Sequence, residues 1–345
     1  MPLRTAHSRI AIWTLLILPF APFISLLKIV SGQQAQQEHP RVRVNSDLVT
    51  LSVTVRDRTE NLVGDLKREQ FHLFDDGVEQ KIDVFEEESV PLSLVILIDN
   101  DVNGKEGVRM AESLRSLLGG ISSQDEAIVC RFDVSFYAGE SFSSDLDKLM
   151  ADVKGAQSEI KPIPKYVPDP LVCGNSTTGP PCIAAPTYAG SRPTKALDDA
   201  VFASSELLNT QGVHRRKIIL LISDGANEPK LNKHNFESVK ETLLYENVSV
   251  FSLAIGSDSA KHKFSSMEDY SRLSGGDIYF VSKSRAMEQI YSRITEQARH
   301  AYTLAYVPRG NNSDANFHPL ELHAEGEGLT VQTREGYYKS LPGKR

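Results

Sequence analysis

The stretch "LVILIDNDVNG", residues 94–104, decides the fold. A run of apolar side chains, three of them β-branched, ends in Asp99, and Asp101 and Asn103 follow at alternate positions. An uninterrupted apolar run of this length is typical of a strand that is buried on both faces of a sheet. The polar side chains behind it indicate that the strand brings oxygen atoms to one edge of that sheet.

Similar apolar runs recur between residues 91 and 299 and alternate with amphipathic stretches. Strands are predicted at 92–99, 126–132, 215–225 and 248–256, and helices at 105–120, 144–153, 194–209, about 265–273 and 285–299. Because alternating strands and helices build parallel sheets with helices on both faces, we expect an α/β domain with a doubly wound, mostly parallel sheet.

The segments on either side of this domain, 40–90 and 300–345, have a different pattern. Both contain short alternating strands, and "FHLFDDGVEQ" runs from a strand into an Asp-Gly turn. Neither segment is large enough to close a core comfortably alone. We therefore expect the two to pair as a small antiparallel β module that carries the α/β domain as an insert.

The first 32 residues have the pattern of a secretory signal peptide. Arg4 and Arg9 precede an uncharged apolar run, and small residues follow at 31–32, which predicts cleavage near Gly32. An uncleaved membrane anchor is the alternative, although two prolines interrupt the run. We expect an exported protein, periplasmic or extracellular, that contacts a membrane only if this segment is retained.

The charge of the chain argues against nucleic acid as a partner. Its 345 residues carry a formal net charge of −7, and without residues 1–32 the 35 basic and 45 acidic residues give −10. An acidic chain binds the phosphate backbone poorly.

A proline-rich segment, 156–193, interrupts the alternating pattern. It contains Cys173 and Cys182 around a short polar stretch, and an oxidising compartment would allow these two to form a disulfide. Both a recognition loop and a disordered excursion remain open for this segment. The third cysteine, Cys130, lies in a predicted buried strand, where a free thiol packs as a small hydrophobic group.

Three polar residues are predicted to meet at the carboxyl edge of the parallel sheet. Asp99 and Asp224 each follow a purely apolar run, and Thr194 opens a predicted helix. Ligands of doubly wound sheets bind at this edge. Oxygen ligands of this kind suit a hard divalent cation.

These elements together resemble the metal-ion-dependent adhesion site of von Willebrand factor type A (VWA) domains. The resemblance rests on the segment from Asp99 to Asn103, on "TKALDDA" from Thr194, and on "LLISDG" ending at Gly225. The segments "NSDLVTLSVTVRD", "FHLFDDGVEQKIDVFEEE", "YTLAYVP" and "REGYY" extend it over about residues 40–340, to the exported bacterial VWFA-related acidobacterial-type domain proteins.

The resemblance implies a Rossmann-like VWA domain and a non-catalytic role in adhesion or protein–protein interaction through a bound divalent cation, Mg²⁺, Ca²⁺ or Mn²⁺. Its ligands would be Asp99, Asp101, Asn103, Thr194 and Asp224. The protein partner and the oligomeric state are not indicated.

The chain departs from the family pattern at two positions. Asp101 and Asn103 stand where the family has serines. A third carboxylate would overcompensate a divalent ion and weaken its pull on an acidic group of a partner. We therefore hypothesise a retuned site that prefers a larger ion such as Ca²⁺, or a site in which the side chain of Asp101 fills the metal position.

The same residues are compatible with other structures. Asp-x-Asp-x-Asn-Gly also begins an EF-hand loop, but the twelfth position is Met110 and a strand precedes the loop. The polar residues after the strand can equally be helix caps.

A metal-free scaffold that binds through 156–193 is the second functional hypothesis. A hydrolase is the third, and the chain has no Gly-x-Ser-x-Gly, Walker or Gly-x-Gly-x-x-Gly motif to support catalysis or nucleotide binding.

Overall fold

The computed structural model divides the chain into two units, Met1–Asn45 and Ser46–Arg345. The structure describes residues 48–87, 90–100, 114, 118–119, 121–158, 195–212, 214–255, 264–281, 284–310 and 315–341, all of which belong to the second unit. The predicted signal peptide therefore lies outside the described residues.

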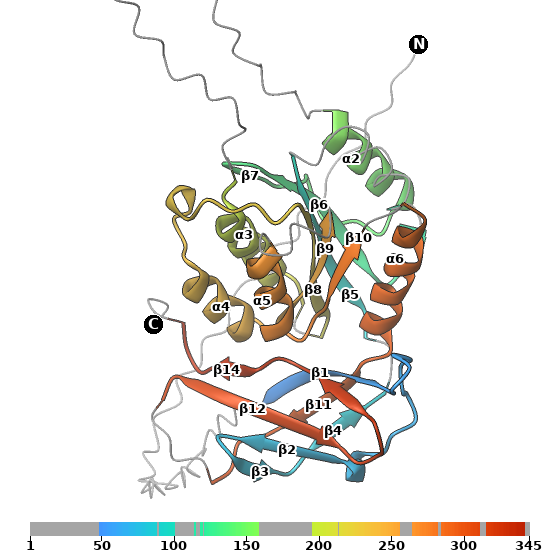
Figure 1. Ribbon diagram of the computed structural model, residues 1–345, viewed down its shortest axis with the longest axis vertical. Coiled ribbons are helices and arrows are strands. Elements are labelled where there is room, and N and C mark those ends of the chain that lie inside the picture. Colours follow the sequence, from blue (N-terminus) through green and yellow to red (C-terminus); the bar gives the residue numbers. More distant parts are fainter. Residues whose placement is uncertain are drawn as a thin grey trace, which may run out of the picture. The chain divides into compact units, whose positions relative to one another are not determined.

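A six-stranded sheet forms the centre of the α/β part, in the order β10-β9-β8-β5-β6-β7 (Figure 1). Its strands are β5 (Leu92–Asp99), β6 (Glu126–Phe132), β7 (Phe136–Tyr137), β8 (Arg216–Ser223), β9 (Val248–Ile255) and β10 (Ile278–Val281). All pairs are parallel except β6 with β7. This is the doubly wound, mostly parallel sheet predicted from the alternating pattern, and the predicted fold class is confirmed.

Helices cover both faces of this sheet. They are α2 (Leu146–Ser158), α3 (Leu197–Asn209), α4 (Phe236–Tyr245), α5 (Ser265–Leu273) and α6 (Ser284–Arg299). In Figure 1, α3, α4 and α5 lie on one face, and α2 and α6 on the other. Alternate residues of β5 and β8 enter the two apolar cores between the sheet and these helices, which explains the unbroken apolar runs at 94–98 and 218–222.

The strands before and after the α/β part form two antiparallel four-stranded sheets, in the orders β13-β1-β11-β4 and β14-β12-β2-β3. The strands are β1 (Val49–Arg56), β2 (Phe71–Asp75), β3 (Val78–Gln80), β4 (Val84–Glu86), β11 (Tyr302–Tyr306), β12 (Phe317–Ala324), β13 (Thr330–Gln332) and β14 (Gly336–Tyr338), with the short 3₁₀ helix η1 (Arg68–Gln70) before β2. Each sheet contains strands from both ends of the chain, as predicted, and their apolar faces share one core.

The "DDG" of the sequence forms the predicted turn between β2 and β3. Asp76 and Gly77 both have positive φ, 51° and 74°. This conformation suits a two-residue hairpin, and Asp and Gly are residues that adopt it readily. The turn fixes the register in which β2 pairs with β3, with Asp75 opposite Val78.

Part of the predicted insertion is helical, since α2 continues to Ser158. Residues 159–194, with Cys173 and Cys182, lie outside the described residues. Cys130 is a buried free cysteine in β6, and burial raises the pKa of its thiol to about 11. No helix among the described residues is long and apolar enough to cross a membrane.

Candidate functional site at the carboxyl edge of the sheet

Two of the predicted site residues lie on neighbouring strands at the carboxyl edge. Asp99 is the last residue of β5, and Asp224 directly follows β8. The two strands are paired up to Ile98 and Ile222, so the carboxylates leave the sheet side by side. Asp99 is fully buried, whereas 45% of the Asp224 side chain is exposed.

The ammonium group of Lys195 lies between these two carboxylates. Its Nζ donates to Asp99 Oδ2 at 2.7 Å and to Asp224 Oδ1 at 2.8 Å, and only 2% of its side chain is exposed. The hydroxyl of Ser223 donates to the same Asp99 oxygen at 2.7 Å, and the N–H of Ala226 donates to the same Asp224 oxygen at 3.0 Å. Both oxygens that contact the ammonium are therefore held in place by a second donor.

Two loops hold the backbone at Lys195. The N–H of Ala196 donates to the carbonyl of Asp133 at 2.8 Å, and the N–H of Glu228 donates to the carbonyl of Lys195 at 2.9 Å. The N–H of Leu197, at the start of α3, donates to the side chain of Asn227 at 3.2 Å. These bonds tie the start of α3 to the loops after β6 and β8 and direct the lysine into the sheet edge.

The lysine remains charged in this position. Burial lowers the pKa of its ammonium, but the charges of Asp99 and Asp224 and their hydrogen bonds outweigh burial, and the pKa is raised. A buried lysine with two carboxylate partners is stable as an ion pair, because the desolvation cost is offset by strong, well-aligned contacts.

In the described part of the site, an ammonium group lies where an ion shared by both carboxylates would lie. An ion bound by both carboxylates would need to lie about 2.0–2.6 Å from an oxygen of each. The ammonium of Lys195 already occupies the space between Asp99 and Asp224. The other three predicted ligands, Asp101, Asn103 and Thr194, lie outside the described residues, so the complete ligand set remains a prediction.

The Asp133 side chain organises the loop next to the site. It accepts from Asn100 Nδ2 at 3.1 Å, from the N–H of Ser135 at 2.9 Å and from the hydroxyl of Tyr137 at 3.2 Å. Its role among these partners is to join the residue after Asp99 to the β6–β7 turn.

A second polar cluster lies beside α3 and α4. The Asp198 carboxylate accepts from the hydroxyl of Tyr270 at 2.8 Å and from the side-chain amide of Asn227 at 3.0 Å. The pKa of the Tyr270 hydroxyl is raised, first by burial and second by the negative charge of Asp198. His234 lies 2.8 Å from Asp199 and stacks on a phenylalanine at a centroid distance of 3.7 Å.

A pocket of about 300 Å³ lies beside this cluster. It is lined by Asp198, Asn227, Pro229, Asn232, Lys233, His234, Asn235, Phe236 and Ser266. Among the described residues, His234 has Asp199 as a hydrogen-bond partner and Phe202 as a stacking partner.

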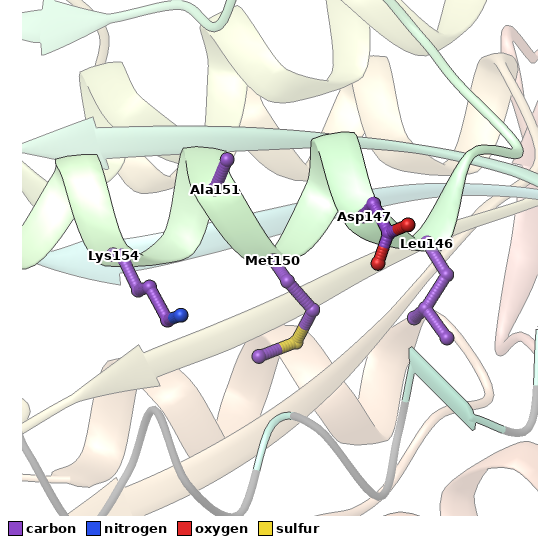
Figure 2. Close-up of a pocket in the computed structure, with 5 residues that line it drawn as sticks. All are labelled: Leu146, Asp147, Met150, Ala151 and Lys154. Atoms are coloured by element: carbon purple, nitrogen blue, oxygen red, sulfur yellow. The ribbon is translucent and has the colours of Figure 1, made fainter.

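A larger hollow, of about 410 Å³, lies along α2. Figure 2 shows its five lining residues on this one helix, with Leu146, Met150 and Lys154 pointing to the same side. The lining is largely apolar, and it includes none of the predicted site residues.

The comparisons with known proteins concern the fold. No protein-family model and no curated protein matches the chain. The structure is similar to the proximal thread matrix protein 1 of the mussel byssus (12% identity, TM-score 0.43, 63% of this chain and 49% of that one). It is also similar to a von Willebrand factor type A protein from Catenulispora acidiphila (10%, 0.42, 86% and 76%).

A third similar structure is BatB from Bacteroides thetaiotaomicron (11% identity, TM-score 0.40, 60% of this chain and 98% of that one). The chain spans about half the length of the mussel protein. Membership of the acidobacterial-type family stays a prediction.

Lys195 is the residue that the sequence analysis missed. It lies inside the quoted segment "TKALDDA", immediately after the predicted ligand Thr194. A signal was present, because a basic side chain just before the first turn of a helix is unfavourable unless an acidic group pairs with it.

The EF-hand alternative is excluded. An EF-hand loop requires a helix before it, and the strand β5 precedes Asp99.

Proposed function

We propose that this protein is an exported, non-catalytic interaction protein that binds a partner protein at the carboxyl edge of its VWA-like sheet without a divalent cation at Asp99 and Asp224. The observation that carries the proposal is the position of the Lys195 ammonium between these carboxylates. An internal cation supplies the positive charge that the resemblance assigned to a metal ion.

An ammonium group in place of a metal ion changes how the edge of the sheet can recognise a ligand. A metal ion with an open coordination position binds an acidic group directly, whereas the buried Lys195 ammonium has both carboxylates as partners and little exposed surface. Recognition would then rest on exposed side chains of the loops around it. Val134, Tyr137 and Leu231 are large apolar side chains exposed in the loops after β6 and β8 and in the short strand β7.

The proline-rich segment is compatible with the same surface. It re-enters the described chain at Lys195, which lies at this edge. The hypothesis of a metal-free scaffold that binds through 156–193 can be tested in the same experiments as the proposed surface.

Site-specific photo-crosslinking tests the location of the surface. A crosslinking side chain at Leu231 is compared with one at Tyr245, which has the same exposed fraction, 41%, but lies at the end of α4 before β9, at the opposite end of the sheet. We expect partner adducts from Leu231 and not from Tyr245, in equal yield with and without EDTA. Adducts that EDTA abolishes would show a metal-dependent site, and adducts from Tyr245 alone would place the surface elsewhere.

Replacement of the lysine tests the internal cation. In Lys195→Ala the two carboxylates lose their cation, and we expect Mg²⁺ to raise the melting temperature of this variant but not that of the wild type. A Mg²⁺ response of equal size in both would contradict the proposal.

A further inference from the structure

A second charged centre lies where the β2–β3 turn meets the beginning of β12. Asp75 ends β2, Asp76 opens the turn, and His318 is the second residue of β12. The pairing of β2 with β12 and a hydrogen bond from the N–H of Asp76 to the carbonyl of Pro319, 3.1 Å long, bring these residues together. Positions 242 residues apart in the chain thus form one centre.

The three side chains have the spacing of metal ligands. His318 Nδ1 lies 2.8 Å from Asp76 Oδ2 and 3.7 Å from Asp75 Oδ1, and one ligand atom from each residue lies within 4.8 Å of the others. Ligand atoms at about 2.1 Å from a zinc ion are about 3.0–3.4 Å apart. These two distances lie on either side of that range, so the three side chains come close to the spacing that an ion requires.

Outer contacts orient two of the three ligands. His318 Nε2 lies 2.9 Å from the carbonyl of Ala315, which leaves Nδ1 facing the carboxylates. The hydroxyls of Tyr306 and Tyr337 donate to Asp75 Oδ2 at 2.9 and 3.1 Å, so Oδ1 faces the imidazole. Metal-binding histidines and carboxylates are held in this way, by a backbone carbonyl behind the ring and hydrogen bonds behind the carboxylate.

We infer that Asp75, Asp76 and His318 bind one divalent transition-metal ion, with Zn²⁺ as the best match. A neutral imidazole with two carboxylates carries two negative charges, which a divalent ion balances. The imidazole nitrogen favours Zn²⁺ over Mg²⁺ and Ca²⁺, which prefer oxygen ligands. Asp75 and His318 are fully buried and Asp76 is 22% exposed, so the ion would enter, and keep any water ligand, on the side of Asp76.

The ion would fasten the two ends of the second unit to each other. Asp75 and Asp76 belong to β2 and to the turn after it, near the N-terminal end of the second unit, and His318 belongs to β12, near the C-terminal end. The site is therefore structural, and it is independent of the Lys195 centre and of the proposed interaction surface.

The same sheet provides a matched control in His72. Its ring also lies between two carboxylates, Glu79 at 2.9 Å and Glu325 at 3.3 Å. These contacts use opposite ring nitrogens and the histidine is exposed, so His72 and its two partners cannot bind one ion together.

Calorimetric titration of the full, chelator-stripped chain with Zn²⁺ tests the inference, with Mg²⁺ as the comparison ion. We expect one Zn²⁺ site in the wild type and in His72→Gln, a loss of at least tenfold in affinity in Asp76→Asn and His318→Gln, and no Mg²⁺ binding at this centre. Binding that survives His318→Gln, or that disappears in His72→Gln, would overturn the assignment.

A measurement on the wild type covers the case in which the His318 or Asp76 variants fail to fold. The ¹⁵N spectrum of the His318 ring should show Nδ1 without a proton once one equivalent of Zn²⁺ is added. If both ring nitrogens keep their protons at that point, the centre is a buried ion pair of an imidazolium with two carboxylates and binds no metal.

Discussion

Lys195 and Asp99 form a buried ion pair at the end of β5, with Nζ 2.7 Å from Oδ2 and neither side chain more than 2% exposed. The two residues are 96 positions apart and meet because the loops after β6 and β8 hold the start of α3 against the sheet edge. In this chain the carboxylate that resembles a metal ligand is neutralised from within the protein.

Removal of this cation should destabilise the fold strongly. Lys195→Met leaves a fully buried Asp99 without its ammonium partner, and breaking a buried pair from one side costs about 3–5 kcal/mol. Urea unfolding of wild type and variant at pH 7 measures the difference.

The control for this prediction is Lys240→Met. Lys240 and Glu335 are also 2.7 Å apart but are partly exposed, and such pairs contribute about 0–1 kcal/mol. Equal losses of unfolding free energy in the two variants would show that the buried Lys195 pair stabilises the fold no more than a partly exposed pair does.

The strands and the edge could be predicted from the sequence because their signals are local. Apolar runs that end in Asp99 and Asp224 define both the parallel sheet and the side on which the carboxylates emerge. The Asp-Gly turn at Asp76 is local as well. Each of these predictions required only the pattern of side chains within one element.

The partners of these residues could not be predicted, because they depend on contacts between distant elements. Lys195 has the sequence context of a solvent-exposed residue before a helix, and its entry into the sheet edge follows from the loops that bind α3. His318 meets Asp75 only through the register between β12 and β2, strands from opposite ends of the chain. No local pattern specifies that register.

Asp125 should stabilise the protein at neutral pH and lose this effect in acid. Its buried carboxylate accepts from the N–H groups of Leu92 and Ser122 at 2.9 and 2.7 Å and pairs with Arg299. Burial alone raises the pKa of Asp125, but these donors outweigh it and hold the pKa below 3.8. A lowered pKa gives stability that is present above 3.8 and lost as the pH falls through the folded value.

We therefore expect Asp125→Asn to lose about 1–3 kcal/mol at pH 7, as for other buried hydrogen-bonded groups. The deficit should shrink below about pH 4, where the unfolded carboxyl group protonates. Urea unfolding at pH 7, 5 and 3 measures this difference in unfolding free energy. Asp147→Asn serves as the control, because Asp147 is exposed. A deficit that is constant over this range would contradict the pKa argument.

His72 should titrate above its ordinary value and support the β2–β3–β12 sheet in mild acid. The hydrogen bond to Glu79, followed by that to Glu325, raises the pKa of its imidazole above 6.5. A raised pKa gives stability that is fully present below 6.5 and lost as the pH rises through the folded value. The melting temperature of His72→Gln should therefore lie below that of the wild type at pH 5.5 and equal it at pH 8.5.

An NMR titration of the imidazole protons checks the cause of this pKa shift. In Glu79→Gln/Glu325→Gln the pKa of His72 should return to about 6.5. If the pKa stays raised in that double variant, the two glutamates are not responsible for it.

The three cysteines should differ in reactivity. Cys130 is buried in β6 and burial raises its pKa to about 11, so its thiolate is scarce at pH 8 and a thiol reagent reaches it only after unfolding. Cys173 and Cys182 are predicted to form a disulfide in an oxidising compartment. Protein isolated from an oxidising compartment should therefore show no reactive thiol when native, one after unfolding without reductant, and three after reduction. Three thiols in the unfolded, unreduced protein would refute the disulfide, and rapid labelling of the native chain at Cys130 would refute its burial.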